Sequence, residues 1–321
     1  MNKPFKTFEE QVKILSGMNN NKFRMKVDEN TIFHLMRNNY YSIINFYKDP
    51  FLKKTSTKEK DIYKSNVHFN HLKALYDFDR DLRILFFSVL TQLEVFFKTA
   101  IAYYFSQTYC SSESYLKPEN YYIGMKNENV HIVSSIIKEM NYIKKDNENT
   151  IIRYYNTTKD NVPFWITANF LTFGKISRIY LILDINVQNK IISHCRNIYR
   201  REYGEIINLT NNFIKTFLKS SVLFRNLAAH NDRFYDFSIK NAIKSVNVTG
   251  ITNNKKQKLF TIYEGLKLFL SKEEYDKFTL KLKGLISELE IKFESITGIN
   301  DILEKMDFPK NWHKSIKKTL E

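Results

Sequence analysis

The chain has 321 residues, among them only eight glycines and five prolines but 26 phenylalanines and 20 tyrosines. So few turn-forming residues favour long helices over a turn-rich β fold, and so many aromatic residues exclude a disordered chain. A formal net charge of +16 predicts a polyanionic partner, with nucleic acid favoured over an anionic membrane surface. An AT-rich genome produces the same Lys-rich composition, so charge alone leaves the question open and does not separate RNA from DNA.

No membrane span, secretion signal or metal site is predicted. No uninterrupted apolar run reaches the roughly 18 residues that a span needs, and the N-terminus lacks the apolar core of a signal peptide. Cys110 and Cys195 are the only cysteines, which excludes a disulfide framework and a thiolate metal site. His68 and His71 lie three residues apart, but no carboxylate or third His repeats that spacing nearby. We therefore expect a cytoplasmic protein without a bound metal.

The first 60 residues predict an N-terminal helical region. Thr7 and Glu10 have the spacing of a capping box, which predicts a short helix that ends at Gly17. A second helix is expected at 28–47, with the sequence Asn-Tyr-Tyr of residues 39–41 in its middle. The polar, basic connector that follows, at 48–61, is interpreted as a solvated loop.

The longest periodic segment, 76–109, predicts a helix with a broad apolar face. On its opposite side, five polar residues fall within about 80° of one another: Arg80, Arg83, Thr91, Glu94 and Lys98. So narrow a line indicates a groove wall or a buried polar seam that faces another helix. The alternative is an exposed strip with i,i+4 pairs such as Glu94 with Lys98.

The rest of the chain also predicts helices. Residues 111–160 are interpreted as an insertion that contains one helix, at 130–144, and Pro163-Phe164-Trp165 then opens a buried helix. The sequence Thr-Phe-Gly-Lys of residues 172–175 interrupts that helix, and Gly174 is expected to permit a tight helix-to-helix turn there. A connector with room for one short strand is expected at 236–254, followed by two helices. The second begins at a capping box, Ser271 to Glu274, and runs to about residue 295. Residues 306–312 are expected to form an apolar clasp.

A helix from Asn208 to about Asn231 is expected to organise the fold, and it carries Arg225, Asn226 and His230 near its end. Its buried stripe recurs at spacings of three and four: Phe213, Phe217, Ser221, Phe224 and Ala228. Cations near a helix C-terminus also complement the helix dipole, and Asn231 can cap the last turn. The pattern R-x4-H is therefore weak when it is taken alone.

Helix geometry places the polar residues of this segment on different faces. At about 100° per residue, Asn226 and His230 share a polar face with Lys215 and Lys219. Arg225 and His230, five residues apart, diverge by about 140°. They cannot easily close on one phosphate from one straight helix.

Three blocks in this order resemble the bacterial abortive-infection (Abi) proteins of the AbiD/AbiF type. The first runs from Tyr76 to Arg83 with Glu94 downstream, and the second joins Pro163-Phe164-Trp165 to the sequence Thr-Phe-Gly of residues 172–174. The third is the segment from Arg225 to His230. Residues 39–41 and 308–312 fit as well, so the resemblance spans nearly the whole chain.

This family is similar to the HEPN superfamily, whose signature is an Arg, a polar residue, and a His four to six positions beyond the Arg. Arg225, Asn226 and His230 occupy these places. The resemblance implies an all-α, HEPN-like helical bundle with inserted and appended helices. It also implies a phage-defence toxin, which in some members is restrained by a structured noncoding RNA. Lys98 departs from the family pattern, since Arg is expected there and Lys lacks its bidentate fork.

The three signature residues suit the cleavage of RNA through its own 2′-hydroxyl. A base removes the hydroxyl proton, an acid protonates the leaving 5′-oxygen, and a cation stabilises the phosphorane. Imidazole transfers protons near neutral pH, which suits His230, and the planar fork of Arg225 matches phosphate oxygens. Asn226 is expected to orient the phosphate or the ring. No metal or other cofactor is needed, and no carboxylate cluster of a two-metal nuclease occurs.

These observations predict a metal-independent endoribonuclease. The residues expected to bind RNA are Arg80, Arg83, Lys98, Lys215 and Lys219, with Glu94 as a supporting polar residue. Because the chain holds one R-x4-H element, a homodimer that joins two of them at a two-fold axis is expected. The predicted regions are 1–60, a core at 61–240 and a C-terminal helical region at 241–321. The alternatives are a non-catalytic RNA-binding scaffold and a purely structural interaction protein.

Overall fold

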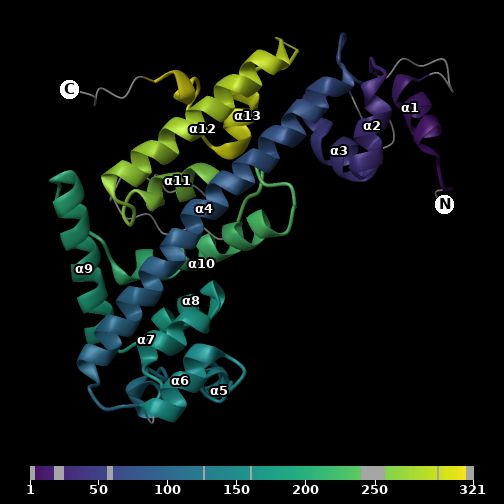
Figure 1. Cartoon of the computed structure of the whole chain (residues 1–321). Coiled ribbons are helices and arrows are strands. Elements are labelled where there is room, and N and C mark those ends of the chain that lie inside the picture. Colours follow the sequence, from purple (N-terminus) through teal and green to yellow (C-terminus); the bar gives the residue numbers. More distant parts are fainter. Residues whose placement is uncertain are drawn as a thin grey trace. The chain divides into compact units, whose positions relative to one another are not determined.

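The computed structural model describes residues 4–17, 25–55, 61–125, 127–159, 161–239, 257–294 and 296–315. Within these ranges every regular element is a helix, from α1 to α13 with short 3-10 turns between them (Figure 1). Extended pairing is limited, in the same ranges, to isolated bridges such as that between Tyr121 and Leu183. The predicted all-α class is confirmed.

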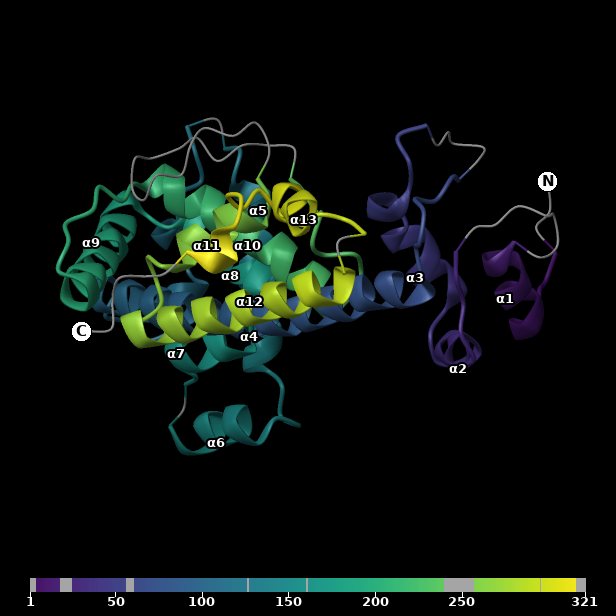
Figure 2. The ribbon, with the colours of Figure 1, turned by 90° about the horizontal axis from the view of Figure 1, so that it is seen from above.

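The chain forms two compact units that alternate along the sequence. Unit 1 contains residues 1–85, 231–237 and 278–321, and unit 2 contains 86–230 and 238–277. Helices α4 (Phe69–Thr108) and α12 (Lys272–Phe293) each contribute residues to both units. Figure 2 shows α4 as one continuous helix. Each unit therefore draws on more than one of the three regions predicted from the sequence.

Besides its parts of α4 and α12, unit 1 contains six short helical elements within the described ranges: the helices α1 (Phe8–Ser16), α2 (Asn30–Arg37), α3 (Tyr40–Tyr47) and α13 (Ile299–Met306), and the 3-10 turns η2 (Asp49–Phe51) and η6 (Trp312–Lys314). The capping box at α1 is confirmed, since Thr7 and Glu10 bond to each other's backbone and Gly17 ends the helix in a left-handed conformation. The C-terminal clasp is also confirmed, because buried Phe308 packs edge-on against Trp312 at 4.7 Å.

The single helix expected at 28–47 is wrong, because the chain is extended between α2 and α3. Asn38 has φ −136° and ψ 139°, and the side chain of Asn39 accepts a hydrogen bond from the Tyr41 N–H at 2.8 Å. An Asn side chain that bonds to the backbone in this way competes with a continuing helix and caps a new one. The triplet predicted for the middle of a helix instead begins α3.

The connector at 48–61 is only partly the solvated loop that was expected. Pro50 and Phe51 are buried in η2, and the Phe51 ring meets Phe293 at 5.6 Å. Lys53 and Lys54 are exposed as predicted. Lys58 and Lys60 lie outside the described residues, as does most of the connector predicted at 236–254.

A buried carboxylate, Asp79 on α4, ties three segments of unit 1 together. It accepts hydrogen bonds from the Tyr47 hydroxyl at 2.6 Å and from the backbone N–H groups of Phe234 and Tyr235 at 2.9 and 2.7 Å. Arg83 forms an ion pair with it at 3.0 Å. Burial raises the pKa of Asp79 to about 6, and these four donors act against that rise. The carboxylate is thus held as an anion at neutral pH.

The structure gives Arg83 a structural position rather than an exposed one. Arg83 is only 3% exposed. Its guanidinium also donates to the Asn231 side chain at 2.7 Å and to the Asp232 carbonyl at 3.1 Å. Every one of these partners belongs to unit 1. An RNA phosphate cannot reach this guanidinium without opening the fold, so Arg83 is not accessible for the RNA contact that was expected of it.

Besides its parts of α4 and α12, unit 2 contains the helices α5 (Val130–Lys144), α6 (Thr150–Thr158), α7 (Phe164–Thr167), α8 (Phe173–Ile182), α9 (Ile185–Tyr203), α10 (Asn211–Ala229) and α11 (Leu259–Leu266). It also contains three 3-10 turns: η3 (Ser114–Leu116), η4 (Pro118–Asn120) and η5 (Ala168–Phe170). The helix predicted at 130–144 is confirmed as α5, and the capping box at Ser271 begins α12 as predicted. α6 and α9 were not predicted.

The role predicted for Gly174 is wrong. The chain turns at Leu171 and Thr172, where the Thr172 side chain accepts a hydrogen bond from the Lys175 N–H and caps α8. Gly174 lies inside α8, and a Cβ there would meet Val222 at an ordinary 3.8 Å. The turn is therefore made by a capping Thr, and it does not require the glycine.

An aromatic stack joins α4, α10 and the segment after α11 in the core of unit 2. Phe217 lies parallel to Phe213 at 5.6 Å and nearly parallel to Phe269 at 5.4 Å, and Phe97 meets Phe269 at 5.2 Å. The predicted stripe of α10 is buried at Phe213, Phe217, Ser221 and Phe224, and it becomes partly exposed at Ala228. The same stack leaves no room beside Gly265, where a Cβ would lie 2.2 Å from the Phe217 ring.

By length and composition alone, α4 could cross a membrane, since one 18-residue window has a mean hydropathy of 1.6. The core helix of a soluble protein passes the same test, and α4 contributes buried side chains such as Leu82 and Phe97 to the units described above. One such helix does not identify a membrane protein. The absence of a membrane partner stays a prediction.

Arg83→Met is expected to lower the free energy of unfolding by about 3–5 kcal/mol near neutral pH, because it leaves the Asp79 carboxylate buried without its cation. Without Arg83 the pKa of Asp79 rises further, so the variant takes up a proton at a higher pH than the native chain. The loss should therefore shrink as the pH falls from the raised pKa of the variant toward about 6, the pKa of Asp79 in the native chain. Urea denaturation at neutral and mildly acidic pH measures both effects.

The matched control is Arg80→Met, because Arg80 is an exposed neighbour paired with Asp77 and Asp81. Exposed ion pairs contribute at most about 1 kcal/mol. Equal losses in the two variants, or a loss at Arg83 that does not change with pH, would contradict the buried pair.

Gly265→Ala is expected to destabilise unit 2 by about 1–3 kcal/mol, because the new methyl group forces the fully buried Phe217 ring to move. Gly284→Ala on α12 is the control. Nothing lies within 4 Å of its Cβ position, and Ala in an exposed helix favours folding by up to about 1 kcal/mol. Thermal unfolding of both variants should give shifts of opposite sign, and a stable Gly265 variant would count against the close packing.

Candidate functional site

The helix that carries the R-x4-H element is α10, which begins three residues later than predicted. The Thr210 side chain caps its start by accepting a hydrogen bond from the Phe213 N–H at 3.2 Å. The helix ends at Ala229, and the His230 N–H still donates to the Asn226 carbonyl at 3.1 Å. Asn231 has a φ of 58°, the left-handed conformation expected of an Asn that follows a helix.

Arg225 is held by a carboxylate on α4. Its Nη2 donates to Glu94 Oε2 at 2.9 Å, and its guanidinium carbon lies 5.9 Å from the centre of the Phe173 ring. The Arg225 side chain is 21% exposed, yet its Nε is shielded from solvent and has no hydrogen-bond partner. The guanidinium is therefore fixed in place while one of its donors remains unused.

Glu94 divides its two oxygens between two cations. Oε1 forms an ion pair with Lys98 Nζ at 2.9 Å, and Lys98 also donates to the Asn169 carbonyl at 3.1 Å. Both side chains of this pair are only 13% exposed. At these residues the polar line on α4 is a shielded seam that faces another helix, which is one of the two predicted interpretations. Glu94, which was expected to support the site, forms an ion pair with Arg225. We call Glu94, Lys98 and Arg225 the polar cluster.

The other residues of the polar line are not part of this cluster. Arg80 is exposed in unit 1, and its guanidinium pairs with Asp77 and Asp81 on its own helix. Thr91 donates its hydroxyl to the Ser88 carbonyl. The line predicted from helical spacing is therefore divided among residues that have separate local partners.

Helices α8 and α10 pack side by side (Figure 1). A groove of about 720 Å³ is lined mainly by residues of these two helices. Its polar lining includes Lys175, Arg178, Lys215, Lys219 and Asn226, and its apolar lining includes Ile132, Leu181, Val222 and Leu223. No acidic side chain is among its lining residues in the described part of the chain. We call it the basic groove. It brings together Lys215, Lys219 and Asn226, as the predicted polar face of this helix requires.

Most cations of the basic groove are not neutralised. Lys175 pairs with Glu139, but in the described ranges Arg178, Lys215 and Lys219 form no ion pair with an acidic side chain. Burial lowers the pKa of Lys215, because a partly dehydrated ammonium group loses solvation. Uncompensated positive charge in a hollow of this kind favours the binding of an anion.

Lys175 and Arg178 were not among the residues predicted for the site. The available signal was their spacing of three on α8, on the side away from the buried residues Ile176, Ile179 and Tyr180. That spacing places them on one face of the helix. Which helix they face depends on tertiary packing, and the sequence did not reveal it.

The three signature residues do not converge within one chain. Asn226 and His230 are exposed, whereas Arg225 turns toward Glu94. In the described part of the chain the His230 imidazole makes no hydrogen bond, and none joins it to Arg225. This arrangement agrees with the divergence predicted from helical geometry. A phosphate bound at Asn226 would therefore meet groups on only one side.

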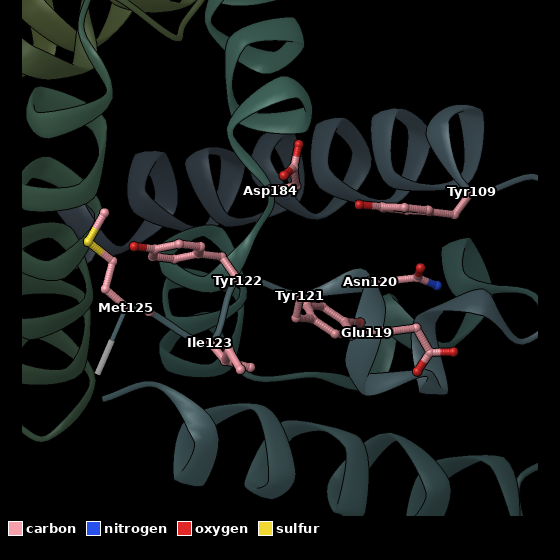
Figure 3. A pocket seen from close by; sticks show the side chains of 9 residues that line it. Tyr109, Glu119, Asn120, Tyr121, Tyr122, Ile123, Met125 and Asp184 are labelled. Atoms are coloured by element: carbon pink, nitrogen blue, oxygen red, sulfur yellow. The ribbon is translucent and has the colours of Figure 1, made fainter. Parts of the chain in front are cut away.

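A smaller pocket of about 250 Å³ has the opposite electrostatic character (Figure 3). Glu119 and Asp184 lie on its walls together with the rings of Tyr109 and Tyr122. No basic residue is among its described lining, and Asp184 is engaged as the N-cap of α9. Two carboxylates without a cation disfavour a phosphate, so this pocket is not a candidate RNA site.

His68 and His71 have a local structural role. The buried His71 ring accepts a hydrogen bond from the His68 N–H through Nδ1 at 3.0 Å, and the two rings meet edge-on at 5.4 Å. Burial lowers the pKa of His71 and favours the neutral ring that this bond requires. Within the described ranges, no group of three or more His, Cys, Asp or Glu side chains could hold a metal ion.

The fold and the site together define a class: an all-α protein in which an R-x4-H helix borders a basic groove. The family model described as Abi-like protein matches residues 33–236, a range that holds all three sequence blocks. Because this match covers more than half of the chain, the protein belongs to the Abi-like protein family, as the sequence blocks predicted. No curated protein and no solved structure matches the chain.

Proposed function

We propose that this protein acts in phage defence by abortive infection, as a cytoplasmic endoribonuclease of the HEPN type. RNA lies along the basic groove and is cut beside Asn226 and His230. The observation that carries the proposal is that uncompensated Lys215, Lys219 and Arg178 line a hollow that reaches Asn226 on the signature helix. A polyanion fits such a groove, and a chain with a formal net charge of +16 attracts it.

The proposed reaction needs only proton transfer and charge stabilisation. The RNA 2′-oxygen forms a bond to the adjacent phosphorus as a base removes the 2′-hydroxyl proton. The bond from phosphorus to the 5′-oxygen breaks, and an acid gives that oxygen a proton. The products carry a 2′,3′-cyclic phosphate and a 5′-hydroxyl. His230 serves as the proton-transfer group, and Asn226 orients the phosphate.

Arg225 stabilises the negative charge that develops on the phosphorane, and Glu94 positions it. The ion pair at 2.9 Å fixes one terminal nitrogen of the guanidinium, so its remaining donors are presented in a defined direction. Lys98 occupies the other oxygen of Glu94, which reduces the repulsion between that carboxylate and a phosphate. Lys98 thereby acts through Glu94 in this proposal.

The active form in this proposal is a homodimer. One chain supplies one R-x4-H element, and its Arg and His lie on different sides of α10, about 140° apart. Two motif helices across a two-fold axis place four functional groups around one groove, so that the second His serves as the acid. A structured noncoding RNA bound in the basic groove would occupy the same surface as a substrate and restrain the enzyme.

A second candidate function is an RNA-binding scaffold that does not cut. The observation that favours it is that Arg225 is already neutralised by Glu94 while the His230 imidazole is unoriented by any hydrogen bond in the described ranges. A general base usually needs such an orienting partner. The two candidates differ in one measurable property, the appearance of cleaved RNA.

His230→Ala is expected to lower the rate of RNA cleavage by about 10²–10⁴-fold, the usual contribution of a general acid or base. RNA affinity should stay within a factor of about three, because His230 lies beyond the lining of the basic groove. Gel assays that resolve 2′,3′-cyclic phosphate ends measure the rate, and cleavage should continue in EDTA. Cleavage that survives the substitution would contradict the mechanism.

Lys219→Glu separates binding from chemistry. This charge reversal should weaken RNA binding and lower the slope of log affinity against log salt, with His230 intact. Lys277→Glu on α12 is the matched control, since Lys277 is exposed and lies away from the groove lining. If the two charge reversals weaken RNA binding equally, the protein attracts polyanions in general and the basic groove is not a specific RNA site.

The homodimer is tested by mixing active and inactive chains. Native chains mixed with an excess of His230→Ala chains should lose more cleavage rate than dilution alone explains, because a mixed dimer lacks the second His that serves as the acid. Light scattering measures the molar mass, and activity over a dilution series should fall as the dimer dissociates. Full specific activity in a monomer, or an unchanged rate per native chain on mixing, would contradict a shared site.

A further inference from the structure

We propose that a second groove in unit 2 binds an unpaired nucleobase of the RNA by stacking it on Trp165 and Tyr103. This inference rests on the proposed function and adds the substrate class, single-stranded RNA, because a base within a duplex is already stacked. The groove has a volume of about 570 Å³ and is lined by Lys98, Tyr103, Gln107, Trp165 and Asn169, among others. We call it the aromatic groove.

Two large aromatic side chains of the aromatic groove, Trp165 and Tyr103, are exposed to solvent. Trp165 is 55% exposed and Tyr103 is 59% exposed, although both belong to a unit with a large aromatic core. Large aromatic side chains that stay in solvent lose the free energy that burial would give them. Base–aromatic stacking is the interaction that such rings provide to single-stranded nucleic acid.

The motif Pro163-Phe164-Trp165 explains how the tryptophan is presented. Pro163 begins α7, and Phe164 is buried, stacked on Tyr115 at 5.2 Å and against Phe105 at 5.3 Å. Trp165 is the next residue of the same turn, so the buried ring anchors the exposed one. A ring held on a packed element pays little conformational entropy when it binds a ligand.

Polar groups beside the rings suit the edge of a base. Asn169 lines the groove, and its side chain donates through Nδ2 to the Trp165 carbonyl at 2.9 Å, which fixes its orientation and leaves its Oδ1 available as an acceptor. Gln107 is exposed on α4, and its amide offers both a donor and an acceptor. A volume of this size is within the range of about 300–1,000 Å³ that small organic groups occupy.

Position links the aromatic groove to the polar cluster. Lys98 belongs to both, since it pairs with Glu94 and lines the aromatic groove. Tyr103 lies nine residues beyond Glu94 on α4, which corresponds to about 14 Å along the helix. The base in the aromatic groove therefore belongs to a different nucleotide from the one whose phosphate lies at Arg225. The groove thus adds affinity for an unpaired flanking nucleotide.

The test uses the fluorescence of Trp165 in the full chain. The chain holds two tryptophans, so Trp312→Phe leaves Trp165 as the only one. The probe is a short 2′-O-methylated oligoadenylate, which the proposed chemistry cannot cut, and its abasic counterpart has the same charge. We expect the oligoadenylate to quench Trp165 emission and the abasic strand to leave it unchanged.

Affinity measurements complete the test. Trp165→Ala and Tyr103→Ala should each weaken oligoadenylate binding by about 5- to 150-fold. Tyr142→Ala is the matched control, because Tyr142 is 77% exposed on α5 and lies outside both grooves. Equal binding of the two strands, or a Trp165 variant that behaves like the Tyr142 variant, overturns the proposal. Quenching by polyglutamate alone also overturns it and identifies a site for an acidic protein segment.

A failure of the stacking proposal can be distinguished from a failure of the proposed cleavage. Quenching and affinity do not depend on cleavage, so an active His230→Ala variant would sink the catalytic mechanism and leave the stacking measurement intact. Conversely, loss of cleavage in that variant together with an unchanged affinity of Trp165→Ala would sink the aromatic groove alone.

Discussion

The structure depends on one constraint, which is that charges removed from water must be paired. Helix α4 carries charged residues into each unit, and two of its shielded carboxylates receive cations: the buried Asp79 pairs with Arg83 in unit 1, and the half-buried Glu94 pairs with Lys98 and Arg225 in unit 2. A buried charge without a partner costs several kcal/mol. These pairs therefore determine which residues of distant segments must meet α4, and one of those segments is the signature helix itself.

Local signals predicted much of the fold, and non-local ones did not. The capping boxes at Thr7 and Ser271 and the bounds of α5 follow from short-range chemistry and were predicted correctly. The break at Asn38 was missed because an apolar period continued across it, although Asn39 offered a competing cap. Helix α9 was overlooked despite a buried residue every four positions: Val187, Ile191, Cys195 and Tyr199.

The candidate site divides in the same way. Helical spacing was enough to place Lys215, Lys219 and Asn226 on one face and to predict the Glu94–Lys98 pair. It could not provide the partner of Arg225, because Glu94 lies 131 residues away in the sequence. Nor could it show that Arg83 is enclosed, since burial depends on segments at 231–235 that spacing on α4 does not describe. The spacing of polar residues along a helix predicts which side of the helix they share. Whether a ligand can reach them depends on how other segments pack against that side.

The Nε of Arg225 is shielded from water and has no hydrogen-bond acceptor. A donor in this state lowers the stability of the folded protein by about 1–3 kcal/mol, and the protein carries this cost while no ligand is bound. Any ligand whose oxygen reaches this nitrogen removes the cost, so the gain appears only in the bound state. A molecule that carries no acceptor at this position gains nothing from the donor. The resting side chain therefore favours ligands with an oxygen at this position over molecules that only fill the space.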